Sequence, residues 1–305
     1  MLTKLLNKFI KPPTIKISCL GGAGEIGMNL YVYESEKSAI IVDYGIMFAD
    51  NSMPGIDSIY PDPEYLKSIH NKVSAVVFTH GHEDHIGGVL AMRELLNVPV
   101  YTGKFTAELL RHKAERAAIE LDIIEVTDKQ RITAGDFTLD FISVDHSIPD
   151  TFAVRLSCKG FTALHASDFR TGNDIDALIK RFTEVPLTCL LIDSTNANAS
   201  ATKENRSEFE IYNEIVEIFK EAKGRIFLTT FASNVERLSS AIKAAKAVGR
   251  KIVIEGAAME RTIGIASRMG IIHISESDML PASKAHKEDP ASLVYLASGC
   301  QGEYM

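Results

Sequence analysis

The stretch that decides the fold is Thr79-His80-Gly81-His82-Glu83-Asp84-His85, directly after the β-rich run SAVVF at residues 74–78. It places three of the nine histidines of the chain and one aspartate within six residues. Two histidines two positions apart can bind one ion where the backbone forms a tight loop, which Gly81 permits. Asp84 and His85 then face a second position nearby. Since zinc prefers imidazole and carboxylate ligands in open sites, the cluster predicts a metal site rather than ordinary surface or core histidines.

Two later segments fit the same site. His146 lies in SVDHS and Asp168 lies in HASD, and each directly follows a predicted strand. Functional side chains collect at such strand-to-loop transitions. His165 is predicted to support the site rather than to bind an ion. The other histidines have no partner in the sequence and are expected to be surface or core residues: His70, His112, His273 and His286.

Alternating and apolar runs predict a strand-rich first part. A helix is expected at residues 86–96, and the strand at 187–192 is expected to be buried. The other strands are predicted at residues 14–20, 29–34, 38–43, 74–78, 98–101, 137–144, 153–157 and 162–165. This pattern favours a layered α/β domain whose site lies on loops at the ends of strands.

Regular alternation of helix and strand follows. Helical spacing of Phe209, Ile211, Ile215 and Phe219 predicts a helix over residues 207–222. The remaining elements are strands at 225–230, 251–255 and 293–297 and helices at 235–248, ended by Gly249, and 259–269. Such alternation indicates a separate parallel α/β unit. The boundary is placed in the polar run ANASATKENR, which gives domains at residues 1–205 and 206–305.

Composition narrows the class of protein. The net charge of −7 argues against a basic protein that coats nucleic acid, although metal ions can supply positive charge at a reacting phosphate. The four cysteines include no C-x-x-C pair, which favours buried free thiols in a reducing compartment. No apolar stretch is long enough to span a membrane, and the N-terminus lacks a signal-peptide pattern. These features predict a cytoplasmic protein with no membrane association.

The motifs resemble a known family. The H-x-H-x-D-H pattern at residues 80–85 is the signature of the metallo-β-lactamase fold, and Asp43, His146 and Asp168 match its other motifs. The resemblance narrows to ribonuclease J and its β-CASP domain through GGAGEIGMN (21–29), PGID (54–57), YPD (60–62), DSTN (193–196), FASN (231–234), MER (259–261) and SGCQGE (298–303). It implies an α/β protein in which a metallo-β-lactamase αββα sandwich is followed by a partial β-CASP α/β domain.

The resemblance implies a role for each site residue. One ion would be bound by His80, His82 and His146, and another by Asp84 and His85, with Asp168 bridging both. His80, Asp84 and Asp168 would carry catalysis, and Asp43 would hold a ligand histidine in orientation. Ser233 and Asn234 could receive the 5′-phosphate of RNA, but the two residues fit a plain helix cap equally well.

The implied activity is metal-dependent hydrolysis of RNA, with 5′-3′ exonuclease and endonuclease action in RNA processing and decay. The cofactors would be two divalent ions, zinc or alternatively manganese, since such ions activate water and offset phosphate charge. The implied partners are RNA with a 5′-monophosphate end and further copies of the chain in a homo-oligomer.

The chain ends earlier than the family pattern. The H-x-S-G-H-like motif and a last histidine ligand for the second ion would follow the SGCQGE segment, so a fragment or a shortened relative is expected. A catalytically impaired RNA-binding or scaffold paralogue is therefore one alternative. The other is a small-molecule metallo-hydrolase, since the fold supports many chemistries. The second α/β unit argues against the latter, and the intact metal motif argues against the former.

Overall fold

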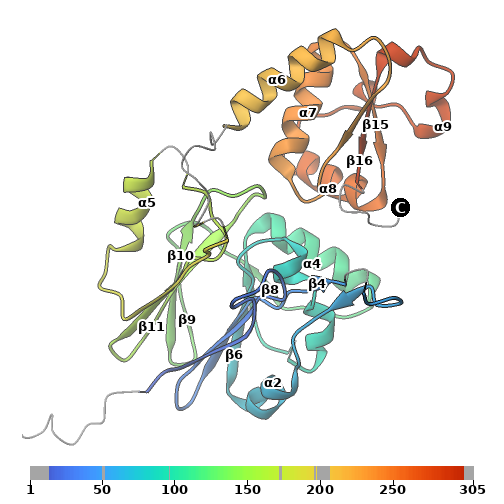
Figure 1. Cartoon of the computed structure of the whole chain (residues 1–305). Helices are drawn as coiled ribbons and strands as arrows, with labels where there is room; N and C mark the ends of the chain where they lie inside the picture. The colour runs from blue at the N-terminus through green and yellow to red at the C-terminus, as the bar shows by residue number, and fades with distance from the viewer. Residues whose placement is uncertain are drawn as a thin grey trace, which may run out of the picture. The chain divides into compact units, whose positions relative to one another are not determined.

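The computed structural model describes residues 14–49, 52–95, 97–171, 174–195, 197 and 207–298 (Figure 1). The chain forms two compact units. The first unit runs to Thr195, and the second contains the residues from Asn196 onward together with Ser147–Pro149. The boundary expected at residues 205–206 lies outside the described residues. None of the helices in the described ranges combines the length and the apolar character that a membrane span requires.

The first sheet carries the metal motif at the end of a central strand. Its first three strands are antiparallel neighbours, and its last four run parallel. The spatial order is β1 (Lys16–Gly21), β2 (Leu30–Glu34), β3 (Ala39–Val42), β6 (Val73–Val77), β7 (Val100–Thr102) and β8 (Ile123–Glu125). All four residues of β3 are buried because both faces of the strand are covered. The short hairpin of β4 (Met47–Phe48) and β5 (Ser58–Ile59) follows β3.

The second sheet packs face to face on the first. Its spatial order is β13 (Cys189–Leu191), β12 (Phe161–His165), β11 (Phe152–Cys158), β10 (Phe137–Ser143) and β9 (Arg131–Ala134). A shared apolar core fills the space between the two sheets. Both sheets contribute buried side chains to this core, among them Ile40, Val42, Val77, Phe137, Leu139, Phe141, Val154 and Leu156.

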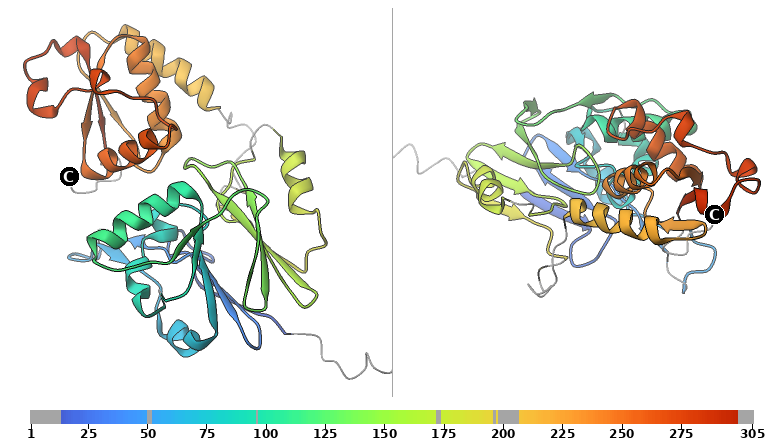
Figure 2. Two further views of the ribbon diagram at one scale, coloured as in Figure 1. Left: turned by 180° about the vertical axis from the view of Figure 1, so that it is seen from behind. Right: turned by 90° about the horizontal axis from the view of Figure 1, so that it is seen from above.

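Helices cover the outer faces of both sheets and complete the αββα sandwich (Figures 1 and 2). They are α2 (Glu64–Ile69), α3 (Glu83–Ile86), α4 (Lys104–Arg116) and α5 (Ile175–Phe182), with 3-10 turns at His70–Lys72 and Val89–Leu95. The single helix expected over residues 86–96 is wrong. The chain ends α3 at Ile86 and continues from Val89 as a 3-10 segment that contains a kink at Met92.

The second unit is built on a three-stranded parallel sheet. Its order is β14 (Ile226–Thr229), β16 (Leu293–Ala297) and β15 (Lys251–Glu255). The longer helices are α6 (Glu208–Glu221), α7 (Val235–Ala247) and α8 (Ala257–Arg268), and the shorter ones are Glu276–Asp278, α9 (Ala282–Ala285) and Pro290–Ser292. Helices α6 and α7 lie side by side in both views of Figure 2. A capping box between Ser207 and Glu210 begins α6.

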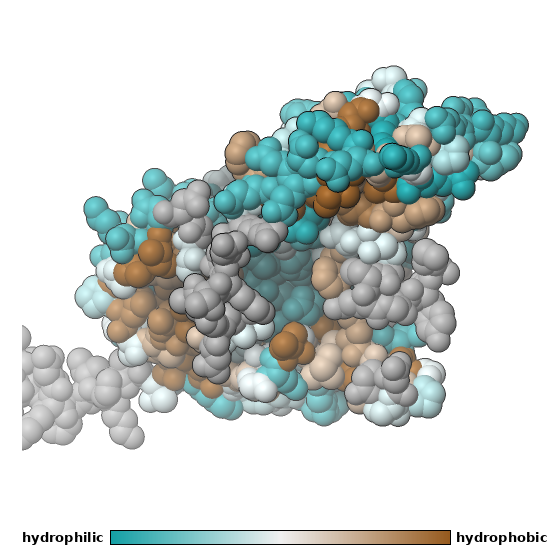
Figure 3. Space-filling view, turned by 45° about the horizontal axis from the view of Figure 1, so that its top comes forward, coloured by the Kyte–Doolittle hydropathy of each residue, from teal (hydrophilic) through white to brown (hydrophobic). Residues whose placement is uncertain are grey.

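Two predictions about burial, for the strand at residues 187–192 and for the cysteines, are wrong in part, and one apolar side chain of α6 stays outside the core. The strand at residues 187–192 is an edge strand, so Leu190 and Ile192 remain 50% and 49% exposed. On the face drawn in Figure 3, hydrophobic residues gather at the left, in the part of the first unit that contains α5 and the second sheet. Cys158 is buried, but the Cys19 thiol lies on an exposed residue of the edge strand β1. Phe209 in the first turn of α6 is 72% exposed and does not join the core.

Candidate metal centre

The ends of two neighbouring parallel strands bring the metal motif and Asp43 together. Strand β3 ends at Val42 and β6 ends at Val77, and these two residues are paired neighbours in the sheet. Asp43 follows β3 directly, and its backbone N–H donates to the Val77 carbonyl at 2.9 Å. Its carboxylate accepts two hydrogen bonds from Thr79, one from the backbone N–H at 2.8 Å and one from Oγ1 at 2.9 Å. The start of the histidine loop is therefore fixed to the end of the neighbouring strand.

Backbone hydrogen bonds then fix the rest of the loop. The carbonyls of Glu83, Asp84 and His85 accept hydrogen bonds from the backbone N–H groups of Ile46, Asn29 and Tyr44, at 3.0, 3.0 and 2.9 Å. Gly45 lies so close to this loop that a Cβ atom there would stand 1.5 Å from the Asp84 carbonyl oxygen. Any side chain at position 45 would displace the loop, so glycine is required. No motif in the sequence predicts this role of Gly45.

Three imidazoles and one carboxylate converge as a first ligand group. Nδ1 of His82 lies 3.0 Å from Nε2 of His80 and 3.1 Å from Nε2 of His146. Asp168 Oδ2 lies 3.9 Å from the His80 nitrogen and 3.7 Å from the His146 nitrogen. All four ligand atoms lie within 4.8 Å of one another. His146 and Asp168 come from segments that follow β10 and β12 of the second sheet, whereas His80 and His82 follow β6.

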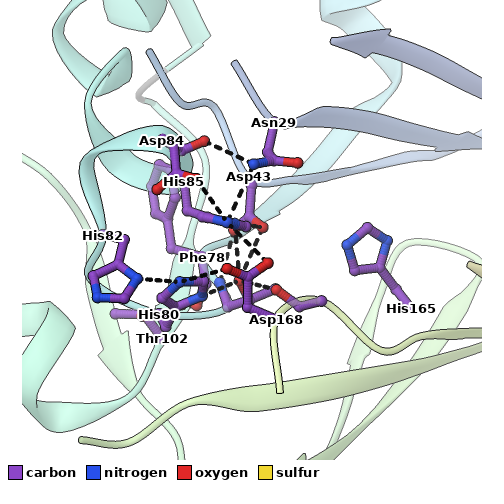
Figure 4. Close-up of polar contacts among 12 residues, drawn as sticks. Asn29, Asp43, Phe78, His80, His82, Asp84, His85, Thr102, His165 and Asp168 are labelled. Atoms are coloured by element: carbon purple, nitrogen blue, oxygen red, sulfur yellow. Dashed lines mark hydrogen bonds and ion pairs between the residues drawn. The ribbon is translucent and has the colours of Figure 1, made fainter. Parts of the chain in front are cut away.

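A second ligand group shares one residue with the first. Nε2 of His85 lies 3.6 Å from Asp84 Oδ2 and 3.4 Å from Asp168 Oδ1. The two carboxylate oxygens of Asp168 therefore face different groups, Oδ2 the first and Oδ1 the second. Figure 4 shows Asp168 beside His80 and His85, with Asp84 on the far side of His85. This is the arrangement in which one carboxylate can bridge two ions.

Hydrogen bonds fix the orientation of the His85 ring. Asp43 Oδ2 lies 2.7 Å from Nδ1 of His85, and Nε2 points at the second group, where Asn29 Nδ2 also lies 3.2 Å from it. Ser167 donates to Thr79 Oγ1 at 2.8 Å, and Thr79 in turn donates to Asp43. Asp43, Thr79 and Ser167 are all buried. A carboxylate that binds the second nitrogen of a ligand histidine fixes both its tautomer and its ring orientation.

The protonation states differ between the two groups. Burial lowers the pKa of His80 well below its usual value, the pKa of His82 to about 3 and that of His146 to about 4. These three imidazoles are neutral near pH 7, which is the form that binds a metal ion. Burial also opposes protonation of His85, but the charge and hydrogen bond of Asp43, with the hydrogen bond of Asp168, outweigh it and raise the pKa of His85.

The two carboxylates of the groups are also perturbed in opposite directions. Burial raises the pKa of Asp168, but the hydrogen bond and charge of His85 and the charges of the other histidines outweigh it and bring this pKa to about 2. Burial, together with the nearby charge of Asp168, raises the pKa of Asp84. Asp168 is therefore ionised at neutral pH, as a bridging ligand must be.

The donor set fits divalent ions. An ion with bonds of about 2.1 Å in tetrahedral geometry holds its ligand atoms roughly 3.4 Å apart. Four contacts within the first group measure 3.0 to 3.9 Å, and two within the second measure 3.4 and 3.6 Å. Close approach of three neutral imidazole nitrogens satisfies few hydrogen bonds by itself, and Nδ1 of His146 is buried without a hydrogen-bond partner in the described structure. An ion held by the facing nitrogens would take the place of these hydrogen bonds, although it would not satisfy Nδ1, the other nitrogen of the His146 ring.

The remaining predicted residues lie elsewhere. His165 is buried beside the ring of Tyr31, and its Nδ1 is 3.0 Å from the Tyr33 hydroxyl, so it packs between strands and belongs to neither ligand group (Figure 4). Asn234 caps α7, because its Oδ1 accepts a hydrogen bond from the Arg237 N–H at 3.0 Å. Ser233 adjoins this cap in the second unit. The structure therefore shows the capping role of Asn234, and phosphate binding by the pair stays a prediction.

Comparison with known protein families agrees with this architecture. The beta-lactamase superfamily domain matches residues 54–230, and the ribonuclease J beta-CASP domain matches residues 223–305. A solved structure of a protein of unknown function from Enterococcus faecalis is similar in fold, with a TM-score of 0.65 and 18% identity over 93% of this chain and 76% of that one. The chain belongs to the beta-lactamase superfamily and contains both of the domains that these matches define.

Comparison with curated relatives shows which members of the superfamily the chain resembles. The chain is 33% identical to ribonuclease J of Mycolicibacterium smegmatis, over 97% of this chain and 54% of the relative. It is 33% identical to ribonuclease J of Helicobacter pylori, over 96% and 44%, and 34% identical to that of Mycoplasma pneumoniae, over 97% and 53%. The resemblance to ribonuclease J that the motifs predicted is therefore confirmed. The chain spans about half the length of the curated relatives it matches.

Proposed function

We propose that this chain is the catalytic part of a metal-dependent ribonuclease that hydrolyses RNA phosphodiester bonds. The observation that carries the proposal is the position of Asp168, whose two oxygens face two ligand groups 3.4 to 3.9 Å away. Two adjacent ions suit phosphodiester hydrolysis, since together they act on the attacking and the leaving oxygen. The match to the ribonuclease J beta-CASP domain supports RNA as the substrate class.

The residues of the first and second ligand groups would bind the two proposed ions. His80, His82, His146 and Asp168 would hold one ion, and Asp84, His85 and Asp168 the other. When bound, such ions supply Lewis-acid activation of water and charge neutralisation at the phosphate. Zinc is the proposed metal, because the set is dominated by imidazole, and manganese is the alternative. Asp43 would position His85 through a hydrogen bond to Nδ1 of the imidazole.

Further parts of the proposal concern the substrate and its setting. RNA with a 5′-monophosphate end would be cut by 5′-3′ exonuclease and endonuclease action, in rRNA processing and mRNA decay. Ser233 and Asn234 would contribute to phosphate binding at the start of α7, since a helix N-terminus of this length favours an anion. A homo-oligomer and a cytoplasmic location complete the proposal, and the free thiols of Cys19, Cys158 and Cys189 fit a reducing compartment.

The test is hydrolysis of a 5′-monophosphorylated, 3′-labelled RNA with added Zn²⁺ or Mn²⁺, beside a His80→Ala control. Metal-dependent cleavage that the control lacks is the expected result. Two bound ions without cleavage of any RNA would overturn the proposal. RNA crosslinking without hydrolysis would then favour the binding or scaffold alternative, and turnover of a small ester alone would favour the small-molecule hydrolase.

A further inference from the structure

The segment after Asp168 contains a cation, Arg170, close to the first ligand group. Phe169 packs into the apolar layer outside the second sheet, with its ring 5.9 Å from that of Phe182 in an edge-on arrangement. The next backbone N–H, from Arg170, donates to the Asp145 carbonyl at 2.7 Å and forms an antiparallel bridge. This bridge places the backbone of Arg170 beside Asp145, at the edge of the first ligand group.

The bridge also joins the two segments that supply ligands from the second sheet. Asp145 immediately precedes His146, and Arg170 lies two residues beyond Asp168. Arg170 is an exposed residue. Its positive charge is also felt inside, because it contributes to lowering the pKa of both His82 and His146. Arg170 is therefore a cation beside the first group that is not itself able to bind a metal ion.

We propose that Arg170 is a phosphate-positioning residue, whose guanidinium binds an RNA backbone phosphate next to the phosphodiester held at the ligand groups. The proposal rests on the proposed ribonuclease function. Arginine suits this role because its planar fork can donate two parallel hydrogen bonds to phosphate oxygens and stays charged at all relevant pH values. In a chain with a net charge of −7, a fixed cation at the edge of the first ligand group would determine where the RNA backbone can approach.

The experiment compares Arg170→Met and Arg170→Lys with Arg131→Met in the metal-loaded protein. Arg131 is a matched control, since its side chain is 68% exposed on β9 and pairs with Asp140. Steady-state cleavage of a 5′-monophosphorylated RNA is measured at several salt concentrations. Arg170→Met is expected to raise KM about tenfold with kcat nearly unchanged, because a hydrogen bond between charged groups is lost. The slope of log(1/KM) against log[salt] is expected to fall in magnitude by about 0.7, as for one phosphate contact to a single strand.

Further readouts separate this role from a structural one. Arg170→Lys is expected to keep the salt slope and recover part of the affinity, and all variants should bind the same number of metal ions. A KM and salt slope in Arg170→Met equal to those of Arg131→Met would overturn the assignment while leaving the ribonuclease proposal intact. So would a loss of bound metal in Arg170→Met, since that would show a role in folding the site.

A second experiment tests the Arg170 assignment in case the protein does not cleave RNA. If the metal-loaded protein cleaves no RNA, bis(p-nitrophenyl) phosphate is used as the substrate and a short RNA is added as a competing inhibitor. The compound has no second phosphate, so its KM is expected to be the same in Arg170→Met and Arg131→Met. An inhibition constant of the RNA that rises in Arg170→Met, but not in Arg131→Met, would support phosphate binding by Arg170 although RNA is not the substrate. An unchanged inhibition constant would overturn the Arg170 assignment together with the ribonuclease proposal.

Discussion

Asp43 Oδ2 and His85 Nδ1 lie 2.7 Å apart and are both buried, so the carboxylate determines which nitrogen of His85 faces the second ligand group. Asp43→Asn keeps the shape but removes the negative charge, and the amide can present a donor to Nδ1. Affinity for one of two ions is expected to fall about 10- to 100-fold, as for other residues that orient a ligand. Titration calorimetry with Zn²⁺ measures both events. The prediction would be contradicted if the affinity for both ions fell equally. It would also be contradicted if the affinity in Asp43→Asn fell no more than in the control variant Asp136→Asn.

Asp168 is the residue whose loss should affect both ions. Asp168→Ala removes a ligand from each group and is expected to reduce bound metal from two ions toward none, whereas His146→Ala should remove only the first. Metal content after gel filtration, measured by atomic emission, distinguishes the two variants. Retention of one tightly bound ion in Asp168→Ala, at the level of His146→Ala, would show that Asp168 does not bridge.

Gly45 should tolerate no side chain. Gly45→Ala places a Cβ 1.5 Å from the Asp84 carbonyl oxygen, so the loop that carries Asp84 and His85 must move. The expected cost is about 3 kcal/mol of unfolding free energy, at the upper end of overpacking effects. Gly224→Ala is the control, because no atom lies within 4 Å of a Cβ at that position. Urea unfolding measures both. A Gly45→Ala variant as stable as the control, with both ions bound, would contradict the predicted contact.

The sequence predicts most residues of the two ligand groups, but not the backbone contacts that position them. The convergence of the histidine cluster, His146 and Asp168 could be predicted, because ligand chemistry depends on residue type and these residues follow strands of one domain. Strands β15 and β16 were predicted with the bounds the structure gives. Gly45 could not be identified, since its constraint comes from the backbone of Asp84, which is distant in sequence. The 3-10 segment after Ile86 was missed although Gly87 and Gly88, which disfavour a helix interior, directly follow Ile86 in the sequence.

The burial of the edge strand was missed for a different physical reason. An apolar run such as that at residues 187–192 predicts a strand, but not whether a neighbour covers it. In the described structure β13 pairs only with β12, so Leu190 keeps half of its surface exposed. Exposure of this kind depends on the position of the strand in the sheet, which local pattern does not encode.

The two ions should respond differently to pH. The pKa of His82 is about 3 and that of His146 about 4, so the first group stays neutral and its affinity is expected to change little between pH 7.5 and 5.5. The pKa of His85 is raised, so an ion at the second group must displace a proton, and its affinity should rise with pH by about tenfold per unit. Competition with a chelator at pH 5.5, 6.5 and 7.5, corrected for chelator protonation, measures both slopes. In His146→Ala only the steep, pH-dependent event should remain. Two ions with the same slope would show that His85 does not carry the displaced proton.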